Sequence, residues 1–150
     1  MTNSELATLF GELADIMELA GEGFFKIRAY RNAAEIIKNY RELVESIPPD
    51  KLIAVPGIGK AITEKVQIAG TSGTFPTLEK WRQNDYATLL PLCRLPGITP
   101  KMVRALIKEL NIKTMDDIRS ATADGRLNSY EKLDAESKRV IYEYTKSNCA

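Results

Sequence analysis

Two short glycine turns carry the residue pattern best suited to hold a phosphate group. The first spans residues 56–59 (Pro-Gly-Ile-Gly) and the second spans residues 96–99 (Pro-Gly-Ile-Thr). Glycine lets the backbone approach another molecule closely, and the first amides of a following helix have no partners within that helix. The positive end of the helix dipole lies behind these amides and favours an anion. The sequence therefore predicts two phosphate-binding positions.

The turns do not match two better-known nucleotide-binding motifs. A P-loop needs glycine at position 54 and Ser or Thr after Gly59-Lys60, but the chain has Ala54 and Ala61. The dinucleotide fingerprint needs a third glycine where the chain has Ile62. No nucleotide cofactor is expected.

The turns lie in the two copies of a longer internal repeat, residues 52–66 and 92–106. Comparing the copies distinguishes positions that form the hairpin from positions that could take part in chemistry. The shared positions are the turn and one apolar helix face, as in a tight hairpin between two helices. Lys60 corresponds to Pro100, and Lys65 corresponds to Ala105. The scaffold does not require either lysine, so Lys65 is a candidate for chemistry, with plain helix surface as the alternative.

The second turn differs where its helix begins. Thr99 is a good N-cap and Pro100 a good first helical residue, although proline removes one amide donor. Lys101 and Arg104 follow and add positive charge. We expect this turn still to bind a backbone phosphate.

The elements that position these turns are predicted to be helices only. Apolar residues recur at helical spacing over residues 2–20 and 27–40, and no alternating strand pattern is present. The glycine-rich loop at residues 70–73 suggests two helical subdomains, 1–72 and 73–150, each with one turn. Phe24 and Phe25 are expected in the core. Trp81 follows the apolar spacing of its neighbours, which favours the core over a base-stacking platform.

Composition narrows the class of protein. The chain has 150 residues, 44% of them hydrophobic, two cysteines and no histidine, which argues against a disulfide framework and a zinc site. No membrane segment or signal peptide is apparent, so we expect a cytoplasmic protein, nucleoid-associated if bacterial. Residues 1–75 hold eight Lys/Arg and ten Asp/Glu, whereas residues 76–150 hold thirteen and ten.

The chain resembles the front part of the family X DNA polymerases, of the bacterial or beta type. The turns look like tandem helix-hairpin-helix motifs. Residues 25–33 (FKIRAYRNA), 77–83 (TLEKWRQ) and 112–119 (IKTMDDIR) extend the likeness in order and spacing over nearly the whole chain. The resemblance implies a lyase-like domain and a DNA-binding fingers subdomain, with the polymerase palm following in a longer parent chain. The chain is then a front fragment or a stand-alone relative.

The resemblance also implies functional residues. Asp116 and Asp117 match a non-catalytic segment, so no polymerase activity is implied for these residues. The partner is expected to be DNA with gaps, nicks or 5′-phosphate ends. The residues expected to bind it are Lys26, Arg31, Gly57, Gly59, Lys60, Gly97, Thr99, Lys101 and Arg104. Each hairpin is further expected to hold a monovalent cation, Na⁺ or K⁺, through backbone carbonyls, those of Ile53, Val55 and Ile58 and those of Cys93, Leu95 and Ile98.

An enzymatic role is a second implication, since relatives contain a 5′-deoxyribose-phosphate lyase that acts in base excision repair. By alignment, Lys65 would form the Schiff base and Tyr30 would orient the site. A nucleophilic lysine must be partly neutral near pH 7. Phe25 stands where a phosphate-binding histidine is found in a relative, and Ala61 stands where a further lysine is found.

Three hypotheses therefore remain open. The leading one is a sequence-independent DNA-binding module that recognises backbone phosphate. The second is a 5′-deoxyribose-phosphate lyase using Lys65. The third is a protein-interaction module that has lost the DNA site, motivated by the acidic surplus of residues 1–75.

Overall fold

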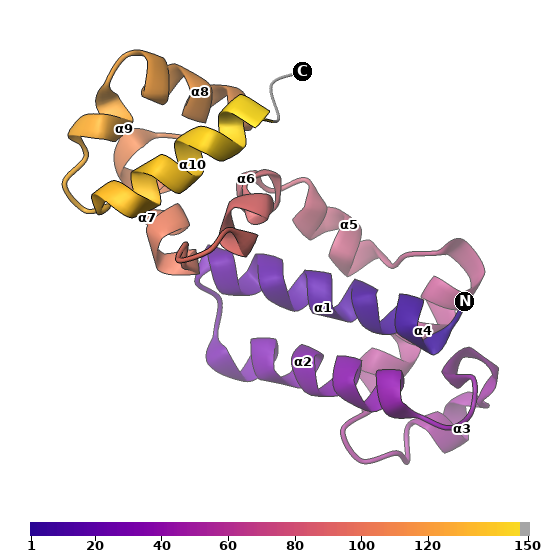
Figure 1. The fold of residues 1–150 in the computed structure, drawn as a ribbon. Coiled ribbons are helices and arrows are strands. Elements are labelled where there is room, and N and C mark those ends of the chain that lie inside the picture. Colours follow the sequence, from indigo (N-terminus) through magenta and orange to yellow (C-terminus); the bar gives the residue numbers. More distant parts are fainter. Residues whose placement is uncertain (148–150) are drawn as a thin grey trace. The chain divides into compact units, whose positions relative to one another are not determined.

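The computed structural model describes residues 1–147 and confirms the all-α prediction. Within that range the chain forms helices and no strand. By their internal contacts, the residues fall into two compact units, which are described separately below (Figure 1). None of the helices in residues 1–147 has the length and apolar character needed to cross a bilayer.

The first unit comprises Met1–Glu18 and Glu22–Arg82. Its elements are α1 (Asn3–Ala20), α2 (Phe24–Asn39), the 3-10 helix η1 (Val44–Ser46), α3 (Pro49–Leu52), α4 (Lys60–Ser72) and α5 (Pro76–Arg82). Helices α1 and α2 run antiparallel (Figure 1). Phe10 of α1 is fully buried, with its ring centroid 6.2 Å from that of Tyr30 and 5.1 Å from that of Phe75. This aromatic cluster joins α1, α2 and the segment entering α5.

The division between the units follows Arg82, whereas the glycine-rich loop led us to expect it between residues 72 and 73. Phe75 and Leu78 are buried within the first unit. The guanidinium of Arg82 pairs with Glu12 of α1, with 3.2 Å from Nη2 to Oε1. Helix α5 therefore packs with the first unit. A glycine-rich loop shows where one helix ends, but not which unit the next helix packs against.

The second unit comprises Leu19–Gly21 and the chain from Gln83 onward. Its elements are α6 (Asp85–Thr88), η2 (Leu90–Arg94), α7 (Pro100–Leu110), α8 (Met115–Ala123), α9 (Arg126–Ser129) and α10 (Ala135–Ser147). Its buried core includes Leu92, Leu106, Ile118, Leu127 and Ile141. Helix α8 starts with a capping box, in which the Asp117 N–H donates to Thr114 Oγ1 and the Thr114 N–H donates to Asp117 Oδ2 (both 3.1 Å).

The expectation that Phe24 and Phe25 lie in the core is wrong. Their side chains are 66% and 84% exposed, and their rings meet edge to face with centroids 5.9 Å apart. The buried residues of α2 include Ala33 and Ile37. At 3.6 residues per turn, both phenylalanines lie more than about 100° around the helix from Ile37. Their apolar character alone did not place them on the inward face.

Candidate functional site

The first hairpin, residues 49–72, joins α3 to α4 through a tight turn. Gly57 has a φ of 89°, in the left-handed region that favours glycine. A Cβ on Gly57 would lie 2.3 Å from Cδ1 of Ile36, so the turn also packs closely on α2. The Ile58 N–H donates to the Val55 carbonyl at 2.9 Å and closes the turn. Gly57 is therefore required by the backbone conformation, and a side chain there would also force the flexible end of Ile36 to move.

The second hairpin, residues 90–110, repeats this backbone geometry between η2 and α7. Gly97 has a φ of 77°, and the Ile98 N–H donates to the Leu95 carbonyl at 3.1 Å. Ile98 is buried, as Ile58 is in the first hairpin. The internal repeat in the sequence therefore corresponds to a repeated turn in three dimensions.

The two helices that follow the turns begin differently. Gly59 is the N-cap of α4 and has no side chain to cover the first amides, which include that of Lys60. At α7, the Thr99 hydroxyl accepts from the Met102 N–H at 3.2 Å, and Pro100 has no N–H. The predicted N-cap at Thr99 is thus present. The first hairpin leaves more amides available to an anion than the second.

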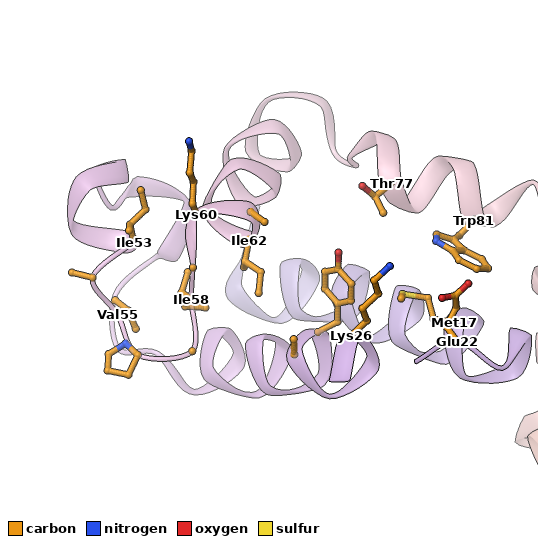
Figure 2. A pocket seen from close by; sticks show the side chains of 17 residues that line it. Met17, Glu22, Lys26, Ile53, Val55, Ile58, Lys60, Ile62, Thr77 and Trp81 are labelled. Atoms are coloured by element: carbon orange, nitrogen blue, oxygen red, sulfur yellow. The ribbon is translucent and has the colours of Figure 1, made fainter. Parts of the chain in front are cut away.

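The predicted DNA-binding cations divide into two groups. Lys26, Lys60 and Lys101 are exposed, and Figure 2 shows the Lys60 side chain extending from the start of α4. Arg31 instead pairs with Glu18 and, with 2.9 Å between Nη1 and Oδ1, with Asp15. Arg104 donates from Nε to the Leu19 carbonyl at 3.0 Å. Both guanidinium groups are already engaged within the protein, so the lysines are better placed to meet a phosphate.

Lys65 and Tyr30, the two residues predicted to be catalytic, lie together in the first unit. The Lys65 Nζ is 5.8 Å from the centroid of the Tyr30 ring, and both side chains are half-buried. An ammonium group at this distance from an aromatic face is in the range of a cation–π interaction. The two copies of the repeat differ here, since Ala105 occupies the equivalent position in the second hairpin.

The turn carbonyls allow a partial check of the expected cation positions. The Val55 and Leu95 carbonyls each accept one backbone hydrogen bond, from Ile58 and Ile98 respectively. A carbonyl oxygen has two lone pairs, so each retains one for a cation. The cation positions at the carbonyls of Ile53, Val55 and Ile58 and of Cys93, Leu95 and Ile98 stay a prediction.

A cavity of about 820 Å³ lies beside the first hairpin, entirely within the first unit. This hairpin cavity is lined by residues 53–62 together with Glu22, Lys26, Tyr30, Thr77 and Trp81. Figure 2 shows side chains of two separate helices, α2 and α5, extending toward the cavity. The sequence interpretation missed the contributions of Glu22, Thr77 and Trp81. Trp81 is half-buried rather than enclosed, which the helical spacing of apolar residues could not distinguish.

Comparison with known proteins agrees with the two-hairpin architecture. Residues 1–75 match the family profile described as "Helix-hairpin-helix domain", and residues 89–133 match that described as "SAM-like Helix-hairpin-helix tandem". Both profiles are consistent with the predicted tandem motifs and confirm them.

Two polymerases are similar to most of this chain. The "DNA polymerase/3'-5' exonuclease PolX" of Bacillus subtilis (strain 168) is 27% identical over 144 residues, which are 95% of this chain and 25% of that protein. The "DNA polymerase lambda" of Arabidopsis thaliana is 27% identical over 119 residues, 79% of this chain and 22% of that protein. The resemblance to family X polymerases is thereby confirmed, and the chain spans about a quarter of the length of these relatives.

Proposed function

The chain belongs to the helix-hairpin-helix domain family, and from this we propose that it is a DNA-binding module that holds backbone phosphates without reading base sequence. The observation that carries the proposal is the repeated turn, with positive φ at Gly57 and Gly97 and a matching hydrogen bond in each copy. Each turn leads directly into the start of a helix, where backbone amides favour the binding of an anion. Contacts to phosphate alone carry no base information.

The expected DNA is a duplex with a gap, nick or 5′-phosphate end, because the two similar proteins are DNA polymerases. Lys60 and Lys101 supply exposed positive charge beside the turns, and Lys26 supplies it at the cavity that the first hairpin lines. A monovalent cation held by the turn carbonyls would add positive charge facing the phosphate. A polymerase palm in a longer parent chain is part of the same proposal.

The test is a titration of gapped, nicked and intact duplexes at several salt concentrations. Neutralising about two to four phosphates predicts a slope of log K against log salt of about −2 to −4. Lys60→Glu should weaken binding and make the slope less negative. Lys80→Glu is the matched control, because Lys80 is also an exposed lysine of the first unit but does not line the hairpin cavity. No binding at low salt, or binding independent of salt, would reject the proposal.

A second candidate function is the 5′-deoxyribose-phosphate lyase, and the proximity of Lys65 to Tyr30 favours it. In that reaction the lysine amine adds to the C1′ aldehyde, and loss of water gives a Schiff base. Removal of a C2′ proton then expels the 3′-oxygen with its phosphate.

Borohydride trapping on an incised abasic duplex tests this second function. The wild-type chain should form a covalent adduct that Lys65→Ala does not form. Tyr30→Phe should reduce trapping less, because it keeps the aromatic face beside Lys65. Equal trapping by wild type and Lys65→Ala would assign the chemistry elsewhere. If neither DNA binding nor trapping is observed, the protein-interaction hypothesis becomes the leading one.

A further inference from the structure

The hairpin cavity is larger, and is lined by more elements, than a site for a phosphate group alone requires. Its volume of about 820 Å³ falls within the range typical of small-molecule pockets, about 300–1,000 Å³. One part of its wall is the first hairpin, which includes the turn and the start of α4. The remainder comes from side chains of α1, α2, α5 and the segment between α1 and α2, none of which belongs to the hairpin.

Two aromatic side chains give the cavity an apolar surface. Trp81 from α5 and Tyr30 from α2 both line it, and both are half-buried. Because Trp81 lines the cavity, a flat ring bound there could lie against its indole. Stacking on an aromatic side chain is how proteins commonly hold unpaired bases.

Three polar side chains lie at the same cavity. Glu22, Lys26 and Thr77 supply an acceptor, a donor and a hydroxyl that can do either. Figure 2 shows Glu22 and Lys26 at the end of the cavity where Trp81 lies, while Lys60 lies toward the hairpin end. A few convergent polar groups in an apolar pocket are typical of sites that orient a ligand by its edge.

We propose that the hairpin cavity binds a single unpaired nucleobase, stacked on Trp81, of a nucleotide whose phosphate the first hairpin holds. This inference rests on the proposed DNA-binding function and extends it to the structure of the DNA end. The module then prefers a duplex end with one unpaired nucleotide to a fully paired end.

The polar groups also predict which bases fit. A carboxylate such as Glu22 only accepts hydrogen bonds at neutral pH, so it pairs with an exocyclic amino group. Adenine, cytosine and guanine carry such a group together with an acceptor for Lys26, whereas thymine carries no amino group. An unpaired thymine should therefore bind less tightly than an unpaired cytosine of similar size.

The experiment uses the whole chain and four gapped duplexes. These differ only at the 5′ end, which is fully paired or carries one unpaired cytosine, one unpaired thymine or one unpaired tetrahydrofuran abasic analogue, which has no aldehyde for Lys65 to attack. Trp81 is the only tryptophan in the sequence, so its fluorescence reports the cavity directly. The cytosine end should quench this fluorescence and bind about tenfold more tightly than the abasic end, the scale of one stacked base. The thymine end should fall between them.

Variants separate a base site from a general effect on folding. Trp81→Leu keeps an apolar side chain in the wall, and it should abolish the preference for the cytosine end while leaving affinity for the paired end unchanged. Glu22→Gln, which leaves the tryptophan in place, should reduce the preference for cytosine over thymine. Circular dichroism of each variant checks that the helices are intact.

The outcomes distinguish this inference from the function on which it rests. Equal affinity for the four DNA ends, without base-dependent quenching, would overturn the base site and leave the phosphate-binding function standing. Failure to bind any of the four would overturn both. Retention of the cytosine preference by Trp81→Leu would also overturn the assignment of the stacking surface.

Discussion

The two hairpins share a backbone turn but differ at the residue that starts the following helix. The first has Gly59, with no side chain over the helix amides, and the second has Thr99, whose hydroxyl accepts from the Met102 N–H. Their turn glycines also differ in surroundings. A Cβ on Gly57 would meet Ile36 at 2.3 Å, whereas a Cβ on Gly97 would have no neighbour within 4 Å.

This difference distinguishes the feature that forms the turn, the backbone conformation of its glycine, from the feature that leaves the helix amides open to a ligand, the absence of an N-cap side chain. The positive φ is needed in both copies, so it belongs to the scaffold. The side chain at the N-cap is optional, because Thr99 shows that the same turn accommodates one. The first hairpin therefore keeps its amides accessible, while the second uses one amide for its own helix.

The largest expected effect contrasts the two turn glycines. Gly57→Ala should destabilise the first unit by about 1–3 kcal/mol, since the left-handed backbone opposes it and the flexible end of Ile36 must move aside. Gly97→Ala should cost about 1–2 kcal/mol, because only the backbone term applies. Denaturant unfolding, followed by Trp81 fluorescence for the first unit and by amide exchange in α7 for the second, measures both.

A double mutant sharpens this contrast. Ile36→Val removes Cδ1, the atom nearest to the Cβ that alanine would add at position 57. It should recover part of the loss in Gly57→Ala and none of the loss in Gly97→Ala. Equal costs at the two glycines, with no rescue by valine, would show that close packing on α2 is not what distinguishes the first turn.

The next effect concerns DNA binding. Gly59→Thr gives the first hairpin the N-cap of the second, and Gly59 has a φ of −94° and open space around its Cβ position. Stability should change by less than about 0.5 kcal/mol, because Thr and Gly are similar at N-caps. Affinity for gapped DNA should fall about tenfold, as one charged hydrogen bond is lost. Gly11→Ala, also at an open glycine, is the control and should leave affinity unchanged.

The reciprocal change in the second hairpin should act on stability. Thr99→Ala removes the hydroxyl that accepts from the Met102 N–H and should cost about 1 kcal/mol. The loss should be measurable as faster amide exchange at the start of α7. DNA affinity should not decrease, because the freed amide becomes available to phosphate. A tenfold loss of affinity with unchanged exchange would contradict the assigned role of Thr99.

The smallest effect is a pH dependence confined to the second unit. The backbone N–H groups of Lys113 and Thr114 donate to Asp117 and hold the pKa of that carboxyl below its ordinary value of 3.8. A lowered pKa in the folded state contributes stability above pH 3.8 that is lost as the pH falls through the folded-state pKa. Acid titration of unfolding should show a loss of stability in wild type that Asp117→Asn reduces, since the pKa values of Asp124 and Glu109 are also lowered. An unchanged acid profile in Asp117→Asn would count against the role of the capping box.

The sequence predicted the two turns correctly because an internal repeat constrains the same positions twice. Gly57 and Gly97 recur since the turn needs their backbone conformation, and Ile58 and Ile98 recur since both are buried. The Thr99 N-cap was predictable from its residue type, because the hydrogen bond it makes is local. Local and repeated features are therefore the ones that the sequence reveals.

Features that depend on packing between distant segments were not predictable. Helix α5 joins the first unit through Phe75 and Arg82, whose partners lie more than 60 residues earlier in α1. The ion pairs of Arg31 with Asp15 and Glu18 likewise depend on how α1 and α2 align. The hairpin cavity was missed for the same reason, since Trp81 and Tyr30 come from separate helices. Whether Arg31 also contacts DNA stays a prediction.

The exposed pair Phe24 and Phe25 affects how the protein behaves at high concentration. Two large apolar rings at 66% and 84% exposure sit on a molecule whose formal net charge is only +1. With little long-range repulsion between copies, such a surface favours self-association and limits solubility. Concentrated samples should show colloidal attraction in light scattering, and Phe25→Ser should relieve it.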